Sequence, residues 1–488
     1  MRRDRVVPRR PRSFLGPAAA ISILVLLEGC AAPSESGFND VATVSAKQLG
    51  DKELVWNRGG PEDAKATEAI KTLLESPLNI DSAVQIALLN NKDLQAAYED
   101  LGVAQADLVQ AGLLQNPVFS ADLLYINGNA PVFAVVQDFV GLLTLGANKR
   151  IASTAFDRIK DETSFKVIQL AADVRAAFYK LVADEQSLDL FRKVVEASEA
   201  AADLAARQRR AGNLNAREQA LQQQTYAGTM LDLARAEAQF ADDREAFNRL
   251  LGLWGDDIAW NLPQKLPDVP MSKPSSEGLE EAAVSQRFDL AAAKRELDRA
   301  SQAHELGTST RFLGAIGIGF VFSRDETDNK FVKGPRLEFA LPLFDQGQAK
   351  IAGLEAELRR RDKLLAGLAV GVRSQVRAAW KRLAAAQDVA LHYQTVMLPL
   401  SQTIVAETQR SYNGMLVGVY DLLLSRQNEI NTARDYIVAV RDYWVARSDL
   451  ERALGGPLPD GAVNQQGKAA IDPSTAGRDD ESNLEARS

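Results

Sequence analysis

The chain has 488 residues, of which 25% are charged, with a formal net charge of -8 and a mean hydropathy of -0.18. The charged fraction excludes a bundle of membrane-spanning helices, and the acidic balance argues against a nucleic-acid partner. One cysteine and two histidines cannot supply a disulfide or a Cys/His metal site within one chain. We therefore expect no cofactor.

Residues 1–29 are predicted to be an export signal, because an arginine-rich start is followed by an apolar run. The run ends in Leu27-Glu28-Gly29-Cys30, which resembles a bacterial lipoprotein box. Such a box implies that Cys30 is lipidated, and the following Ala31 implies the outer membrane. Glu28 departs from the small or apolar residue usual at that position. The alternative is a free cysteine in an uncleaved or differently cleaved signal.

The first half of the mature chain begins with a polar stretch up to about residue 78, predicted to be extended and loosely structured. Asp81 can cap a helix over 81–113, which Asn116-Pro117 ends. Two strands at 118–126 and 132–143 follow, joined by a turn. A turn at Gly146 then leads into a helix over 147–210, and a second helix runs over 214–251.

The second half repeats this order of elements. Equivalent positions are separated by 196, 201, 202 and 203 residues for the pairs Asp93/Asp289, Gly146/Gly347, Gly212/Gly414 and Gly252/Gly455. The long helices, 147–210 and 348–411, have 64 residues each. The spacing therefore indicates an internal duplication. The shorter helices 81–113 and 279–309 are expected to stack end to end on the returning arms, and Pro399 predicts a kink.

The four predicted strands have about the length of a tilted membrane strand, ~9–11 residues. In the third, one face carries Phe312, Ile316, Ile318, Phe320 and Phe322. The fourth alternates in the same way up to Phe344. This pattern is typical of a membrane barrel, although a half-buried sheet in a soluble domain alternates in the same way. Because four strands cannot close a barrel in lipid, several chains would share one, and a trimer would supply twelve strands.

Four short stretches carry a family resemblance: AGLLQNP at 111–117, LPLFDQG at 341–347, YNGML at 412–416 and LGG at 454–456. In this order they resemble the TolC-like outer-membrane efflux proteins. Asn116-Pro117 and the lipoprotein box are most similar to the branch that serves heavy-metal and drug exporters of the resistance-nodulation-division type. The first repeat departs from the pattern at 143–146, which lacks the Pro and Phe of the second.

The resemblance implies a mainly α fold with membrane β structure, in which a trimeric twelve-stranded barrel continues into a periplasmic α-helical barrel. It implies an outer-membrane channel of a tripartite efflux system, with a homotrimer, a periplasmic adaptor, an inner-membrane pump and outer-membrane lipid as partners. The domains expected are a signal peptide (1–29), a lipid-anchored lead (30–78), a first repeat (79–252), a linker at the helical waist (253–277), a second repeat (278–456) and a disordered tail (457–488).

The two helical turns far from the strands are the candidate functional sites. In this family they would dock the adaptor and close as an iris, so Gly212, Leu214, Gly414 and Leu416 are predicted docking residues. Glycine merely permitting the turn is the alternative, and Gly414 is expected to have a positive φ. Asp421 is a candidate periplasmic gate residue, with a solvated helix face as the alternative.

No enzyme constellation is present in the sequence. The pairs Asp242-Asp243 and Asp256-Asp257 are interpreted as turn and surface charges, and His304 and His392 as isolated helix residues. Trp254 and Trp260 are expected to pack where the repeats join. Two other functions stay open: the channel of a type I protein-secretion machine, and a lipid-anchored periplasmic coiled-coil adaptor. The sequence does not name the cargo.

Overall fold

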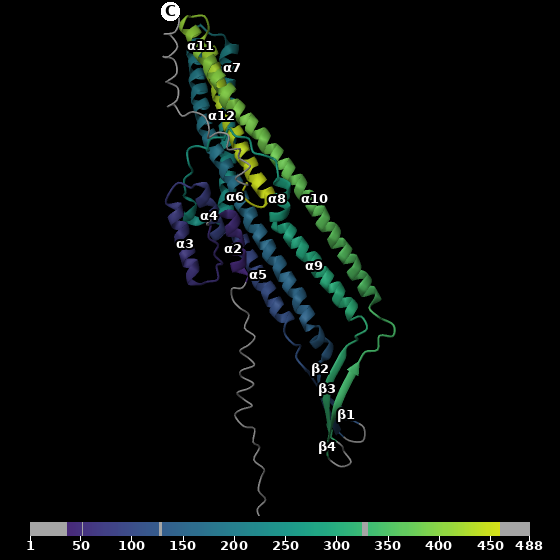
Figure 1. Cartoon of the computed structure of the whole chain (residues 1–488). Coiled ribbons are helices and arrows are strands. Elements are labelled where there is room, and N and C mark those ends of the chain that lie inside the picture. Colours follow the sequence, from purple (N-terminus) through teal and green to yellow (C-terminus); the bar gives the residue numbers. More distant parts are fainter. Residues whose placement is uncertain (1–36, 51, 126–128, 325–329, 459–488) are drawn as a thin grey trace, which may run out of the picture.

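The computed structural model describes residues 37–50, 52–125, 129–324 and 330–458. The molecule is long and tapered, with the strands at one end and two helical tips at the other (Figure 1). The N-terminal helices lie against the middle of the long helices. This middle region is called the waist below.

The element order repeats once along the chain. After two N-terminal helices, α2 (Phe38–Leu49) and α3 (Pro61–Leu74), the first half contains α4 (Ile80–Asn90), α5 (Lys92–Ala111), β1 (Val118–Tyr125), β2 (Asn129–Asp138), α6 (Phe139–Arg210) and α7 (Ala216–Leu251). A 3-10 turn (Gly255–Ile258) lies in the linker. The second half contains α8 (Leu279–Gln286), α9 (Phe288–Ser309), β3 (Ile316–Arg324), β4 (Phe331–Phe339), α10 (Gln348–His392), α11 (Leu398–Asn413) and α12 (Val419–Leu454). The predicted duplication is confirmed.

The strands form one antiparallel sheet in the order β1-β2-β3-β4. Directly paired residues share a face: Val135 lies opposite Phe320, and Phe133 opposite Phe322. The other face carries small and polar residues, such as Gly317 opposite Glu338. One apolar and one small or polar face is the alternation that the sequence predicts. β4 ends at Phe339 rather than continuing to Phe344.

The two strand-to-helix connections differ. The Asp138 carboxylate caps α6 by accepting from the amides of Val140 and Gly141 at 3.0 and 3.1 Å. Residues 139–143 are therefore helical, and the predicted strand end and turn at Gly146 are wrong. In the second repeat Pro342 cannot donate a backbone hydrogen bond, so residues 340–347 form an irregular connection. Gly347 ends it with φ 76°.

The long helix of the second repeat contains an irregular turn. Between α10 and α11, Tyr393–Met397 form a π-helical turn without any break in the helix. The Leu398 amide donates to the Tyr393 carbonyl, five residues back. Because Pro399 lacks the amide that a regular helix needs, the helix is irregular just before it, and the kink expected there stays a prediction. In the first repeat α6 runs for 72 residues without interruption.

The N-terminal lead is more ordered than predicted. Val41, Ser45 and Leu49 are buried on one face of α2, and Ala66 and Ile70 are buried on α3. The Lys160 ammonium on α6 pairs with Asp40 at 3.0 Å. The expectation of an extended lead is wrong for α2 and α3, whose apolar side chains become buried only by packing against other helices.

The predicted helix over 81–113 is two helices. Asn79, not Asp81, caps α4, with its side chain accepting from the Ser82 amide at 2.8 Å. Asn91 separates α4 from α5, and Arg287 separates α8 from α9 at the equivalent position.

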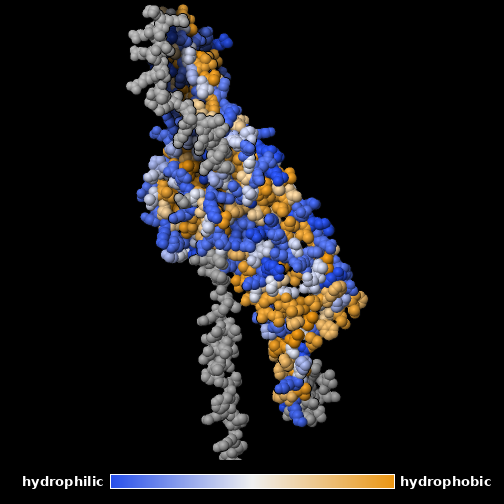
Figure 2. Space-filling view, in the orientation of Figure 1, coloured by the Kyte–Doolittle hydropathy of each residue, from blue (hydrophilic) through white to orange (hydrophobic). Residues whose placement is uncertain are grey.

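Helices lie side by side in the same order as the strands. Toward the sheet the neighbours run α5-α6-α9-α10, and toward the tips α7-α6-α12-α11. Figure 2 shows hydrophobic side chains over the sheet and the adjoining helix ends, with hydrophilic side chains prominent along the helices. Within the described ranges, each helix is either too short or too polar to cross a membrane.

Candidate functional sites at the helical tips and the waist

The two tips have the same backbone geometry at an offset of 203 residues. In the first, the amides of Gly212 and Asn213 donate to the carbonyls of Arg209 and Gln208. In the second, Met415 and Leu416 donate to Tyr412 and Ser411. Each tip therefore closes its helix with the same pair of hydrogen bonds.

The left-handed residue differs between the tips. Gly212 has φ 79°, as a turn glycine should, whereas Gly414 has φ -79° and the left-handed residue is Met415 at φ 59°. The expectation of a positive φ at Gly414 is wrong. The equivalent of Gly212 is Met415, because the second tip is shifted by one residue from the glycine alignment.

The predicted anchors are placed differently. Leu416 is 80% exposed and Met415 is 93% exposed. Leu214 is half-buried, and its carbonyl accepts from Arg209 Nη1 at 3.3 Å. The second tip thus presents two adjacent apolar side chains, while the first presents Asn213 where the second has Leu416.

Asp421 has a capping role in this structure. Its carboxylate accepts a hydrogen bond from the Gly418 amide at 2.9 Å. In the first repeat the Glu218 carboxylate accepts from the Asn215 backbone amide at 3.4 Å in the same way. A carboxylate in the first turn of a helix also stabilises the helix, because its negative charge lies near the positive end of the helix dipole. Its role at a gate stays a prediction.

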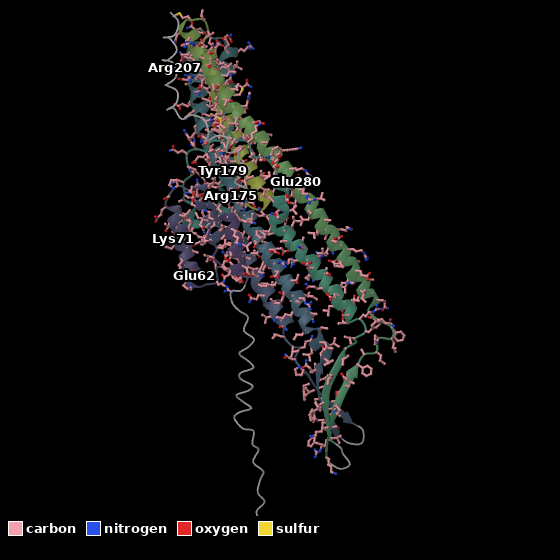
Figure 3. All side chains as sticks on the ribbon, in the orientation of Figure 1. Glu62, Lys71, Arg175, Tyr179, Arg207 and Glu280 are labelled. Atoms are coloured by element: carbon pink, nitrogen blue, oxygen red, sulfur yellow. The ribbon has the colours of Figure 1, made fainter. Side chains whose placement is uncertain are left out.

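A hydrogen bond links the two hairpins just behind the tips. The Tyr420 hydroxyl donates to Gln208 Oε1 at 2.7 Å, from α12 to α6. Beside it lies a cavity of about 280 Å³ between α6, α7 and α12, lined by Ala201, Leu221 and Leu424 among others. Arg207, labelled in Figure 3, lies near this end of the molecule.

At the waist, the returning helices stack end to end on the shorter helices, as the sequence predicts. In the first joint Asn91 Nδ2 donates to the Leu250 carbonyl at 2.9 Å, while Asn91 Oδ1 accepts from the Leu94 amide at 2.9 Å. Asn90 Nδ2 donates to the carbonyls of Leu251 and Gly252 at 3.2 and 2.7 Å. The two asparagines thus provide hydrogen-bond partners for carbonyls at the end of α7 and for an amide at the start of α5.

The second joint uses a buried arginine at the position of Asn91. Arg287 is 7% exposed, forms a bidentate pair with Asp289 at 2.9 and 2.6 Å, and donates to the Ala453 carbonyl at 3.1 Å. Asp289 in turn accepts from the Leu290 amide at 2.9 Å. At this joint Arg287 donates to the end of one helix and Asp289 accepts from the start of the next, whereas in the first joint Asn91 does both.

Two glycines let the joints close. Gly252 and Gly455 end α7 and α12 with φ 70° and 78°. A Cβ on Gly252 would lie 2.6 Å from the Asn90 carbonyl oxygen, and one on Gly455 would lie 2.9 Å from Arg287 Cγ. Both predicted helix ends are confirmed, and each glycine is required by the joint as well as by its backbone.

The waist also holds a carboxyl pair that sequence reasoning missed. Asp184 on α6 faces Asp243 on α7, and Asp243 accepts from Lys180 Nζ at 2.7 Å. Burial, with Asp243 as the second cause, raises the pKa of Asp184 to about 6. The interpretation of Asp243 as a surface charge is wrong, since its side chain is only 15% exposed. Helical periodicity could have placed both residues at the α6–α7 contact.

The structure also places the remaining tryptophan and histidine candidates. Trp260 is buried against Phe247 and donates to Asn248 Oδ1 at 2.9 Å, but Trp254 is 80% exposed, so only one of the two packs as expected. His304 lies 3.8 Å from Glu355, and His392 is exposed. In the part of the chain that the structure describes, no three His, Cys, Asp or Glu residues gather as metal ligands would. Cys30 lies outside the described residues.

Comparison with known proteins gives a consistent result. No protein-family model matches the chain. The cobalt-zinc-cadmium resistance protein CzcC of Cupriavidus metallidurans is 22% identical over 392 residues, covering 78% of this chain and 90% of that protein.

Solved structures share the fold. The Campylobacter jejuni CmeC outer membrane channel aligns with TM-score 0.66 at 16% identity, over 84% of this chain and 91% of its own. The open-state Neisseria gonorrhoeae MtrE outer membrane channel aligns with TM-score 0.64 at 16% identity, over 78% and 89%. Together with the duplicated hairpins and the sheet, these likenesses show that the chain has the fold of these outer-membrane channels and is similar to CzcC over most of its length.

Proposed function

We propose that the chain is the outer-membrane conduit of a tripartite efflux system, connected by a periplasmic adaptor to an inner-membrane pump. The observation that carries this is the pairing of a sheet with one apolar face and two helical hairpins that end far from it. Such a shape places a passage through lipid at one end and a contact surface for soluble proteins at the other.

The assembly we propose is a trimer. Both β1 and β4 have only one partner strand among the described residues, so each has an open edge. An open edge is not tolerated in lipid, and β1 of one copy can complete β4 of the next. Membrane extracts should therefore yield a trimer. A stable monomer with protease-sensitive strands in intact outer membranes would contradict this assembly.

Cys30 is proposed as a lipid anchor that supplements the strands. Cys30→Ser should abolish lipid labelling but leave outer-membrane protein and part of the export, because the strands themselves hold the chain in lipid. Complete loss of the protein from the outer membrane would show that the lipid is required for assembly.

The cargo we propose to test first is a divalent metal cation, because the printed name of the relative in Cupriavidus metallidurans concerns cobalt, zinc and cadmium. Deleting the gene should lower resistance to these ions, and the full chain should restore it. Unchanged resistance in the deletion strain would exclude this cargo.

Adaptor docking is proposed for the tips, with Leu416 as the sharper test because it is exposed and Leu214 is partly committed to its own turn. Leu416→Asp would bury an unpaired charge at an apolar contact and should weaken adaptor binding by several kcal/mol, on the order of 2–4. Adaptor pull-down and export would be measured together, with trimer quantity checked.

Met271→Asp is the matched control, since Met271 is 74% exposed in the linker, away from the tips. Normal adaptor binding and export in both Leu416→Asp and Leu214→Asp would remove these residues from the docking surface. A lost trimer would make the tips structural instead.

A further inference from the structure

A groove of about 850 Å³ lies where the sheet meets the helices. It is bounded by α6, α9, the start of α10 and the irregular connection that follows β4. The lining has more apolar than polar surface, and its apolar residues include Val140, Ile151, Leu306, Leu313, Leu341 and Leu354. Gly307 keeps α9 close to α10 here, since a Cβ on it would lie 2.6 Å from Leu354 Cδ1.

Two cations line the same groove without an acidic partner. Arg311 Nε is buried and has no hydrogen-bond partner among the described residues, and the guanidinium carbon lies 4.5 Å from the centre of the Phe312 ring. Lys350 is exposed and forms no ion pair with any described residue. The one carboxylate in the lining, Asp345, accepts from the Gly347 amide at 2.9 Å and stabilises the turn.

The groove is continuous with the apolar face of the sheet. Leu337 and Phe339 lie on that face, and Leu341 and Leu343 follow at the same alternate positions, with 65% and 68% exposure. Phe344 beside them is 94% exposed. Figure 2 shows hydrophobic side chains over this junction and the sheet beyond it. Exposed apolar surface of this extent indicates a lipid or protein contact.

The apolar and cationic residues of the lining indicate which class of ligand the groove would bind. A soluble anion would use the two cations and leave the apolar lining in water. A neutral hydrocarbon would fill the lining and leave the Arg311 guanidinium without a counter-ion, which is costly in an apolar setting. An amphiphile with an anionic phosphate satisfies both.

We infer that this groove binds one phospholipid of the outer membrane, with an acyl chain against Leu306, Leu313 and Leu354 and its phosphate between Arg311 and Lys350. The inference rests on the proposed outer-membrane location, which places the junction of sheet and helices at the membrane surface. The bound lipid would tie the start of α10 to the membrane.

The test is native mass spectrometry of the full-length trimer in detergent with added phosphatidylglycerol. The expected result is retention of one lipid for each chain. Diacylglycerol with the same chains and inorganic phosphate are the two comparison probes, and each should bind at least roughly tenfold more weakly because each meets only half of the groove.

Lys350→Glu should weaken phosphatidylglycerol binding by roughly tenfold or more, through loss of a charge-assisted hydrogen bond and added repulsion. Because Lys350 is exposed, this variant should fold, whereas Arg311→Glu is the stronger but riskier change. Lys363→Glu, the same charge change on α10 at an exposed site outside the groove, should bind like the unaltered chain.

No retained lipid, or equal retention by Lys350→Glu, would overturn the inference. So would equal binding of diacylglycerol, which would make the site a general apolar surface. A trimer found in the outer membrane without bound lipid would overturn this inference alone, whereas a chain absent from the outer membrane would overturn the proposed function.

Discussion

The two repeats join helix ends at the waist with different side chains. In both, the last carbonyls of a returning helix meet the first amides of a shorter helix. Asn90 and Asn91 close the first joint with neutral amides, whereas Arg287 and Asp289 close the second with a buried ion pair. The backbone requirement is therefore the same, but the electrostatic cost of meeting it differs.

This difference predicts unequal tolerance to mutation. An amide can both donate and accept, so one neutral residue can serve two helix ends. A guanidinium only donates, so Arg287 needs Asp289 both as counter-ion and as acceptor for the Leu290 amide. Removing one member of a buried ion pair leaves the other charge uncompensated, which costs more than the pair contributes.

The largest effect is expected at the second joint. Arg287→Ala should lower the stability of the folded protein by about 3–5 kcal/mol because Asp289 loses its partner. The double change Arg287→Met with Asp289→Leu should recover a large part of the loss, since no charge is then left unpaired. Thermal unfolding in detergent measures both, and a double variant as unstable as Arg287→Ala would contradict this explanation.

A smaller effect is expected at the first joint. Asn91→Ala should cost about 1–2 kcal/mol, through loss of the helix cap and of the bond to Leu250. Asn91→Ser keeps a capping acceptor but shortens the side chain, so it should lose only part of that amount. Unfolding temperatures of the two variants give the comparison. An Asn91→Ala loss as large as that of Arg287→Ala would remove the distinction between the joints.

At the tips, glycine substitutions in the two repeats should have opposite effects on stability. Met415 holds a left-handed conformation that favours glycine, whereas Gly212 already supplies one. Met415→Gly should therefore stabilise the second tip by up to about 1 kcal/mol, and Gly212→Ala should destabilise the first by about 1 kcal/mol. Hydrogen exchange at the tip amides reports both changes. Equal signs in the two tips would show that backbone strain is not the cause.

The smallest effect concerns pH and exists in the first repeat only. The second repeat has alanine where the first has carboxyls, with Ala446 matching Asp243 and residues 384–386 covering the position of Asp184. Burial and Asp243 raise the pKa of Asp184 to about 6. Between its ordinary pKa and about 6, the folded chain binds more protons than the unfolded chain, so this contribution to stability falls as pH rises.

Asp184→Asn should remove that slope and raise stability near neutral pH, with little change in acid. Unfolding temperature measured from about pH 4.5 to about pH 7.5 would show it. The Asp243 pKa is lowered, so its contribution is lost only in stronger acid and does not interfere. The same slope in Asp184→Asn and the unaltered chain would assign the pH dependence to other groups.

Much of the architecture follows from local sequence. The duplication is visible in the spacing of glycines, and Gly252 and Gly455 do end their helices in the left-handed conformation. The alternation in 316–324 predicts both the strand and its apolar face. These features depend on residues that are near in sequence, because helix and strand periods and turn conformations are local properties.

Other features depend on partners distant in sequence. Asn91 and Arg287 look like ordinary polar helix residues until Leu250 and Ala453, 159 and 166 positions away, are placed against them. The helices of the lead, the carboxyl pair at Asp184 and the exposure of Trp254 are decided in the same way. The duplicated helices, strands and turns follow from local periodicity and can be predicted from the sequence. Which helix ends meet depends on the packing of distant segments, because the unsatisfied carbonyls and amides find their partners across the fold.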